Sequence, residues 1–170
     1  FCEKNESVQE ASFFSSSSKY GTPHKQSALA DFIEFTSSEI QILADTIVGN
    51  KRNLTLKITP ERKINKIDLT TDDAFVLNSM SVQGVEFEIE KSEFKINPGQ
   101  FLTYYLSFED KDVTIELDFE ENLSPSLNFI ETSFDLFESE KFNFKPREDY
   151  MMPMPFVNTD AIVLSKKIKL

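Results

Sequence analysis

The chain contains very few of the residues that carry out hydrolytic or metal-dependent chemistry. Its 170 residues include one histidine, one cysteine and no tryptophan. His24 stands between Pro23 and Lys25, where no neighbouring motif orients an imidazole as a general base. A catalytic zinc ion usually takes three protein ligands, mostly His or Cys. We therefore expect no catalytic residue, no metal ligand and no cofactor-binding residue in this chain.

Glycine and positive charge are scarce as well. The four glycines lie far apart, which excludes a glycine-rich phosphate loop. Because 18 basic side chains face 29 acidic ones, the formal net charge is −11, and no basic patch for nucleic acid or anionic membranes is expected. No run of apolar residues reaches the roughly 18 that a membrane-spanning helix requires. The composition therefore argues against nucleic acid as a partner and against membrane insertion by this stretch of chain.

The N-terminal residues have the composition of a connector. Residues 1–30 contain few large aliphatic side chains and a run of serines at 15–18, which is typical of a partly helical or extended segment. Residues 3–14 within it are able to form a short helix. Cys2 has no partner for an internal disulfide, and we interpret it as an inert thiol, with a lipidated N-terminus as the weaker alternative.

Alternation with a period of two residues dominates after about residue 38. Leu54, Leu56 and Ile58 alternate with polar residues, and they follow the run 39–48 across a hairpin-length loop. We therefore predict an antiparallel hairpin there.

A second alternating run follows Gly84, which marks a turn after the apolar run 74–83. Val85, Phe87 and Ile89 alternate with glutamates. We expect the glutamates of this strand to face water and the apolar residues to face the core.

The most regular alternation predicts a further hairpin over residues 101–120, turning at the acidic residues 109–112. Its first strand is expected to bury Leu102, Tyr104, Leu106 and Phe108. Its second strand is expected to bury Val113, Ile115, Leu117 and Phe119.

Two more strands are predicted at 127–137 and 161–170, the latter after a segment rich in methionine and proline. Short strands separated by turn signals, with no helical period, predict an all-β fold. We expect an antiparallel β-sandwich of about seven to nine strands, Ig-like, after an irregular or short helical N-terminal segment. The predicted organisation is a connector over 1–30 and a sandwich over 31–170, closed by the C-terminal strand at 161–170.

Most of the phenylalanines fall on alternating faces and are expected to fill the core. Phe13, Phe14 and Phe156 lie outside the alternation and are candidates for docking against another domain. Tyr105 falls on the outward face of its strand and is a candidate contact for a glycan or a protein. These four residues form the predicted interaction surface.

The acidic turns at 72–73 and 109–112 are candidates for weak calcium binding, because hard cations bind several oxygens of one turn. Neither turn matches the twelve-residue calcium loop, and acidic turns are usually only solvated. We therefore prefer the solvated interpretation.

Three stretches carry a family resemblance. ASFFSSSSKYGT at 11–22 resembles the junction after the membrane-spanning part of bacterial multi-pass zinc metallopeptidases of peptidase family twenty-eight, relatives of the endoplasmic-reticulum metallopeptidase. REDYMMPMPFVNTDAIVLSKKIKL at 147–170 resembles the C-terminal end of these proteins. RNLTLKITPERKINKIDL at 52–69 is similar to their sandwich strands.

The resemblance implies that this chain is the soluble C-terminal β domain of an aminopeptidase-like membrane protein. In that family the zinc ions belong to an N-terminal peptidase part, which a transmembrane bundle follows. The chain would then be a non-catalytic accessory domain on the periplasmic, extracytoplasmic side. Its partners would be the transmembrane and peptidase domains of the parent chain, and a protein or peptide. The residues alone leave an alternative open, a free-standing secreted or cell-surface β-sandwich module that binds a glycan or a protein.

Overall fold

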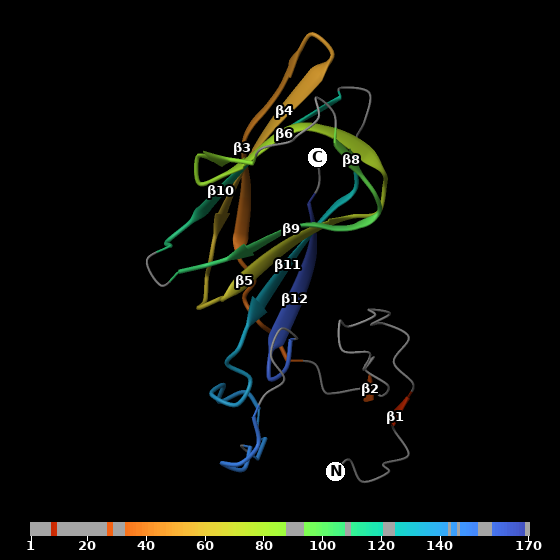
Figure 1. Ribbon diagram of the computed structural model, residues 1–170. Coiled ribbons are helices and arrows are strands. Elements are labelled where there is room, and N and C mark those ends of the chain that lie inside the picture. Colours follow the sequence, from red (N-terminus) through yellow and green to blue (C-terminus); the bar gives the residue numbers. More distant parts are fainter. Residues whose placement is uncertain are drawn as a thin grey trace.

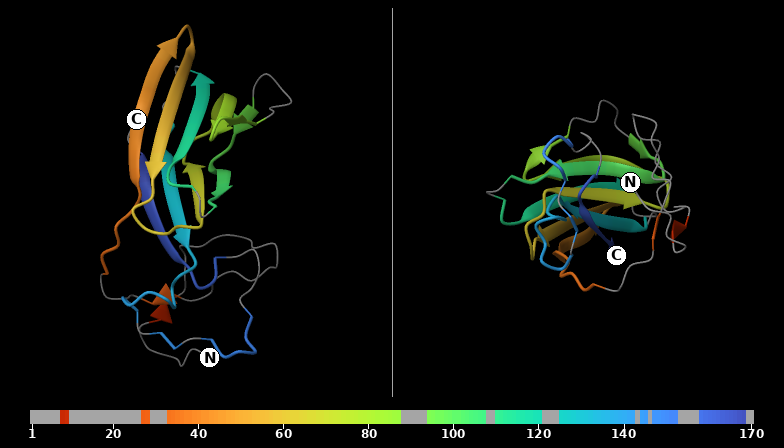
Figure 2. Two further views of the ribbon diagram at one scale, coloured as in Figure 1. Left: turned by 90° about the vertical axis from the view of Figure 1, so that its left-hand side faces the viewer. Right: turned by 90° about the horizontal axis from the view of Figure 1, so that it is seen from below.

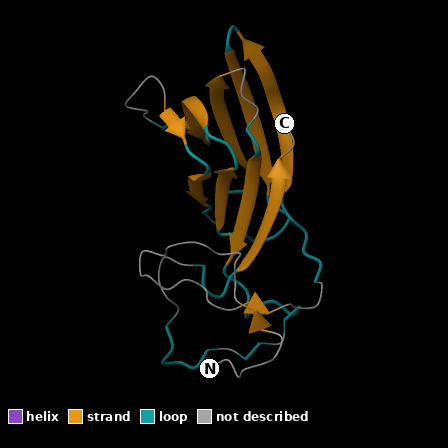
Figure 3. Cartoon of the chain, turned by 90° about the vertical axis from the view of Figure 1, so that its right-hand side faces the viewer, coloured by secondary structure: helices purple, strands orange, loops and turns teal. Residues whose placement is uncertain are grey.

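The computed structural model describes residues 8–9, 27–28, 33–87, 94–107, 110–120, 125–142, 144–145, 147–152 and 158–168. All regular elements among these residues are β-strands (Figure 3). Near the N-terminus, β1 (Val8–Gln9) pairs with β2 (Ser27–Ala28). The short helix expected over 3–14 is therefore not formed at its two described residues, and the others lie outside the described ones. Within the described part of the chain, no helix is long and apolar enough to cross a membrane.

The remaining strands form two antiparallel sheets that face each other, which confirms the predicted β-sandwich (Figures 1 and 2). The larger sheet consists of β3 (Glu39–Val48), β4 (Lys51–Thr59), β6 (Phe75–Val82), β7 (Val85–Glu86), β8 (Phe94–Ile96) and β10 (Val113–Glu120). The smaller sheet consists of β5 (Lys66–Thr71), β9 (Gly99–Tyr105), β11 (Leu127–Ser133) and β12 (Ile162–Ile168). The strand orders are β3-β4-β10-β6-β7, with β8 also paired to β6, and β12-β11-β5-β9.

The core lies between the two sheets and is built from their inward alternating residues. Leu54, Leu56 and Ile58 of β4 are at most 1% exposed, as their spacing predicts. Phe119 of the larger sheet and Phe129 of the smaller sheet are fully buried. Burial of each such side chain contributes about 1.5–3 kcal/mol, so the hydrophobic layer is the main source of stability.

The hairpin predicted after residue 38 is confirmed. β3 and β4 pair along their whole length and are joined by the two-residue turn Gly49–Asn50. Gly49 has φ +69, which a glycine adopts without steric cost. Figure 2 shows the turn of this hairpin extending past the ends of the neighbouring strands. Its tip carries Ile47 and Val48, which are 55% and 68% exposed.

The hairpin predicted over 101–120 is wrong. β9 pairs with β5 in the smaller sheet, whereas β10 pairs with β4 and β6 in the larger one. The connection between β9 and β10 therefore crosses from one sheet to the other. Alternation shows which face of a strand is buried, but it does not show which sheet the strand belongs to. β9 and β10 bury their apolar faces in the same core from opposite sides. Leu102 and Phe119 are buried as expected, while Phe108 lies outside the described residues.

The strand predicted after Gly84 is shorter than expected. The turn itself is confirmed, since Gln83 and Gly84 have φ +53 and +74 between the paired residues Val82 and Val85. β7 then has only two residues, and Val85 and Phe87 are 68% and 45% exposed. These exposures show that the expected burial of its apolar face is wrong. β7 lies at the end of the strand order of its sheet and has a neighbouring strand on one side only. Ile89 lies outside the described residues.

The C-terminal strand closes one edge of the smaller sheet. β12 pairs with β11 from Leu127 opposite Ile168 to Ser133 opposite Ile162. Ile162 and Ile168 are buried, while Lys166 on the same face is exposed. The strand predicted over 127–137 ends earlier, at Ser133, because turns begin there.

Candidate functional site

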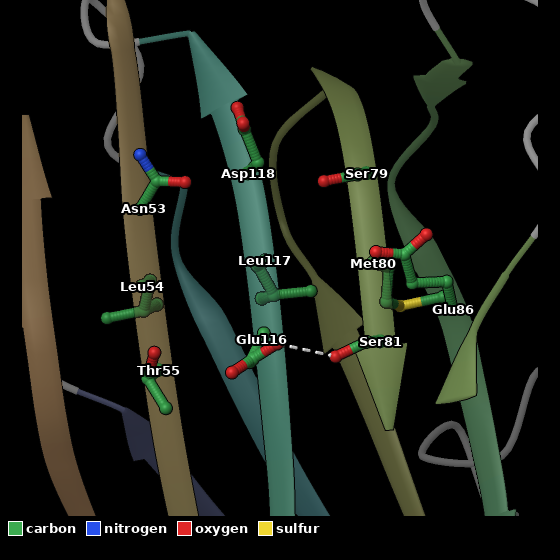
Figure 4. A pocket seen from close by; sticks show the side chains of 10 residues that line it. All are labelled: Asn53, Leu54, Thr55, Ser79, Met80, Ser81, Glu86, Glu116, Leu117 and Asp118. Atoms are coloured by element: carbon green, nitrogen blue, oxygen red, sulfur yellow. Dashed lines mark hydrogen bonds between the residues drawn. The ribbon is translucent and has the colours of Figure 1, made fainter. Parts of the chain in front are cut away.

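A hollow of about 240 Å³ opens on the outer face of the larger sheet (Figure 4). The register of three strands builds it. In one row, Glu116 of β10 lies between Thr55 of β4 and Ser81 of β6. The row two residues further along β10 consists of Asn53, Asp118 and Ser79.

Short side chains create the hollow. The serine and threonine side chains of β4 and β6 reach less far from the backbone than the Glu116 side chain between them. Glu86 of β7, opposite Ser81 in the ladder, borders the hollow on one side. Leu54, Met80 and Leu117 also border the hollow, although their side chains pack in the core on the other face of the sheet. The outward side chains of the hollow are therefore polar.

The polar groups of the hollow are ordered by a few contacts. The Ser81 hydroxyl donates to Oε2 of Glu116 at 2.8 Å, and Nδ2 of Asn78 donates to Oδ1 of Asp118 at 2.9 Å. Nζ of Lys51 lies 3.9 Å from Oδ2 of Asp118. The remaining oxygens of both carboxylates are acceptors for an ammonium, guanidinium or hydroxyl group. No histidine or cysteine lines this hollow, and the described residues contain no group of three or more His, Cys, Asp or Glu that could hold a metal ion.

The predicted contact Tyr105 lies on a different face. It belongs to β9 at the edge of the smaller sheet and is 67% exposed, beside Lys66 of β5. The hollow lies on the other sheet, so the structure does not bring Tyr105 and the hollow together.

An ordered polar network lies on the same face of β5 and β9 as Tyr105. Oδ1 of Asp68 accepts hydrogen bonds from Gln100 at 3.1 Å and from Thr103 at 2.7 Å. Nζ of Lys66 lies 2.9 Å from Oδ2 of Asp68, whose side chain is only 6% exposed. The Asp68 carboxylate is therefore already bound by neighbouring side chains of the protein, and these contacts hold the strands next to Tyr105 in place.

The structure does not test the other three predicted contact residues. Phe13, Phe14 and Phe156 lie outside the described residues, so their docking role stays a prediction. Tyr104 is half-buried against the core and donates to Oδ2 of Asp110 at 3.3 Å. Burial, and after it the negative charge of Asp110, raises the pKa of the Tyr104 phenol.

The acidic turn at 72–73 is engaged by neighbouring strands. Oδ1 of Asp72 accepts from Asn128 at 3.0 Å, and Oδ2 of Asp73 accepts from the backbone N–H of Ser126 at 3.0 Å. In the second turn Asp112 forms a 2.9 Å ion pair with Lys57. These carboxylates therefore stabilise turns through donors of the protein itself.

A buried ionic cluster that sequence reasoning missed lies where the chain enters the sandwich. Glu131 of β11 is fully buried, and its Oε2 accepts from the backbone N–H of Ser38 at 2.8 Å and also from the Ser38 hydroxyl. Nε of Arg62 donates to Oε1 of Glu131 at 3.3 Å. Nη1 of Arg62 also donates to the hydroxyl of Ser133. The charge of Glu131 is thus matched inside the protein, as a buried carboxylate requires.

Phe35 continues this cluster on the segment before β3. Its ring lies 5.9 Å from the Arg62 guanidinium carbon and 4.6 Å from Nζ of Lys141, and it stacks on Phe142 at 5.7 Å. The negative face of an aromatic ring attracts a cation, so both basic side chains interact favourably with the Phe35 ring. We call the following residues the entry clasp: Phe35, Ser38, Arg62, Glu131 and Phe142.

One signal in the sequence could have revealed part of the entry clasp. Leu127 and Phe129 are inward residues, so Glu131 falls at the next inward position of the same strand. A charged side chain at a core position requires a partner. The sequence does not identify that partner, because Arg62 lies in a loop 69 residues away.

No family model, no curated protein and no solved structure matches this chain.

Proposed function

We propose that this chain is a non-catalytic accessory domain of a membrane-bound, aminopeptidase-like zinc metallopeptidase, on the extracytoplasmic side. The support is the resemblance of the stretches at 11–22, 52–69 and 147–170, together with the β-sandwich that this resemblance implies. In such a parent the zinc ions and the chemistry of peptide cleavage belong to the peptidase part. This chain then has a structural role, in which it keeps a fixed orientation relative to the rest of the parent, or an interaction role, in which it offers a docking surface for a protein or peptide.

The entry clasp is the observation that carries the proposal. Ser38 comes directly before β3, and Glu131, which binds it, belongs to the opposite sheet. Arg62 lies in the connection between β4 and β5, which joins the two sheets. The segment that leads into the sandwich is therefore fixed to both sheets. A domain carried on a flexible linker needs no such contacts, whereas a domain that must keep its orientation does.

Two measurements test the proposal. The coding sequence upstream of Phe1 is expected to encode transmembrane segments and a peptidase domain rich in His, Asp and Glu. The chain produced alone is expected to fold as a β protein and to leave aminoacyl p-nitroanilides intact with and without added zinc. Zinc-dependent hydrolysis by the chain alone, or a signal peptide as the only upstream feature, contradicts the proposal.

A second candidate is a free-standing secreted or cell-surface module that binds a glycan or a protein. The exposed Tyr105 ring beside the ordered network of Asp68 favours it, because aromatic rings with adjacent polar groups suit both ligands. This candidate requires a signal peptide directly upstream. It also requires that Tyr105→Ala abolish binding on a glycan array or to a captured protein.

A further inference from the structure

We propose that the outer face of the larger sheet docks a protein segment that presents a lysine or arginine side chain into the hollow over β10. The inference deepens the interaction role proposed above and rests on it. We call the docking surface the short-chain face. It consists of Ala44, Thr46, Asn53, Thr55, Ser79, Ser81, Glu86, Glu116 and Asp118.

The short-chain face extends across neighbouring strands as two rows. In the first row, Ala44 of β3 lies opposite Thr55, which in turn lies beside Glu116. The row continues through Ser81 to Glu86 on β7. The second row consists of Thr46, Asn53, Asp118 and Ser79. Apart from the acids, both rows carry small side chains, so another protein surface is able to approach the sheet closely.

The charge of the face selects the partner. Neither Glu86 nor Glu116 has an ion-pair partner among the residues that the structure describes. Asp118 has only a long contact with Lys51, at 3.9 Å, and the Lys51 side chain is 52% exposed and able to move away. The formal net charge of the whole chain is −11, which adds long-range attraction for a basic partner. An incoming cation is thus attracted over distance and meets carboxylates that have no close ion-pair partner among the described residues.

The geometry fits one cationic side chain. Glu116 and Asp118 are two residues apart on one strand and point to the same side of it, as Figure 4 shows. The hydroxyl of Ser81 already orients Glu116, and the amide of Asn78 orients Asp118. A lysine or arginine that enters the hollow of about 240 Å³ therefore meets two prearranged carboxylates.

The test uses the full chain and a fluorescein-labelled glycine-rich peptide with two lysines and one arginine. Its counterpart has N-acetyl-lysines and citrulline in their place. Fluorescence anisotropy is expected to show binding of the cationic peptide only. Amide chemical-shift changes in two-dimensional NMR are expected to concentrate at residues 53–55, 79–81 and 116–118.

Matched variants separate the site from net charge. Glu116→Gln with Asp118→Asn removes two negative charges but keeps acceptors for Ser81 and Asn78, and it is expected to weaken binding about tenfold. Glu61→Gln with Glu138→Gln removes two charges at exposed residues elsewhere and is expected to weaken binding less than about twofold.

Equal weakening by both double variants, shift changes spread over the whole acidic surface, or no binding at all overturns the inference. These outcomes leave the accessory-domain proposal untouched, because that proposal is decided by the upstream coding sequence and the hydrolysis assay.

Discussion

Oε2 of Glu131 accepts hydrogen bonds from both the backbone N–H and the hydroxyl of Ser38, 93 residues earlier in the chain. The acceptor belongs to the smaller sheet, and the donors come directly before the first strand of the larger sheet. Because Glu131 is 0% exposed, its charge depends on these donors and on Arg62. The contact between Ser38 and Glu131 therefore fixes the position at which the chain enters the sandwich.

Glu131→Gln is expected to lower the free energy of unfolding by about 3 kcal/mol, because it leaves the Arg62 guanidinium without a buried counter-charge. Urea denaturation followed by circular dichroism measures the change. Glu61→Gln, an exposed acid in the loop that also carries Arg62, is the control and should change stability by less than about 0.5 kcal/mol. Equal stability of the wild-type chain and Glu131→Gln would show that the ion pair does not contribute.

Phe35→Ala is expected to loosen the entry segment while the sandwich stays folded. The substitution removes the ring that contacts Arg62, Lys141 and Phe142, and we expect a loss of about 1–2 kcal/mol. Amide hydrogen exchange should accelerate at residues 33–38 and remain slow in β4 and β10. Phe134→Ala, which truncates a 43% exposed ring, serves as control. Unchanged exchange at 33–38 would mean that Phe35 does not hold the segment.

The sequence predicts the faces of the strands better than their neighbours. Leu54 and Phe119 are buried because period-two alternation follows directly from the geometry of a strand. The neighbour of a strand depends on contacts between distant residues, and alternation carries no record of them. For that reason the alternation over 101–120 predicts a hairpin, although β9 and β10 belong to different sheets.

The candidate sites are still less visible in the sequence. The exposure of Tyr105 follows from its position in a strand, and the structure agrees. The hollow, in contrast, exists because Thr55, Glu116 and Ser81 are brought side by side by two strand registers. Each residue taken alone is an ordinary polar residue on an outward face. Only the pairing of β4, β10 and β6 brings them together.

Gly84→Ala is expected to destabilise the chain by about 1 kcal/mol. Gly84 has φ +74, and a side chain strains the backbone in this region even though no atom beyond the adjacent residues lies within 4 Å of the new Cβ. Thermal denaturation of the variant measures the loss. Gly84→Asn provides the comparison, because asparagine tolerates positive φ better than alanine, and it should recover part of the stability. A variant with alanine as stable as the wild type would contradict the strained turn.

Asp45→Asn is expected to reveal a pH-dependent contribution of the ion pair between β3 and β4. Nε and Nη2 of Arg52 each donate to the Asp45 carboxylate at 2.7 Å, and these hydrogen bonds, aided by the charge of Arg52, hold the pKa of Asp45 below its usual range. The pair side chains are 13% and 33% exposed, so solvent screening limits the expected loss at pH 7 to about 0.5–1 kcal/mol.

The direction of the pH effect follows from the lowered pKa. The Asp45 carboxylate stabilises the folded state fully above the pKa of the unfolded chain, about 3.9, and this stabilisation is lost as the pH falls through the lower folded value. The difference in unfolding free energy between wild type and Asp45→Asn should therefore be constant from pH 7 to about 5 and shrink below about 4. Asp112→Asn, at the more exposed pair with Lys57, controls for the change in net charge and should cost less. A difference that grows as the pH falls would contradict the assignment, because a protonated Asp45 has no charge left to pair with Arg52.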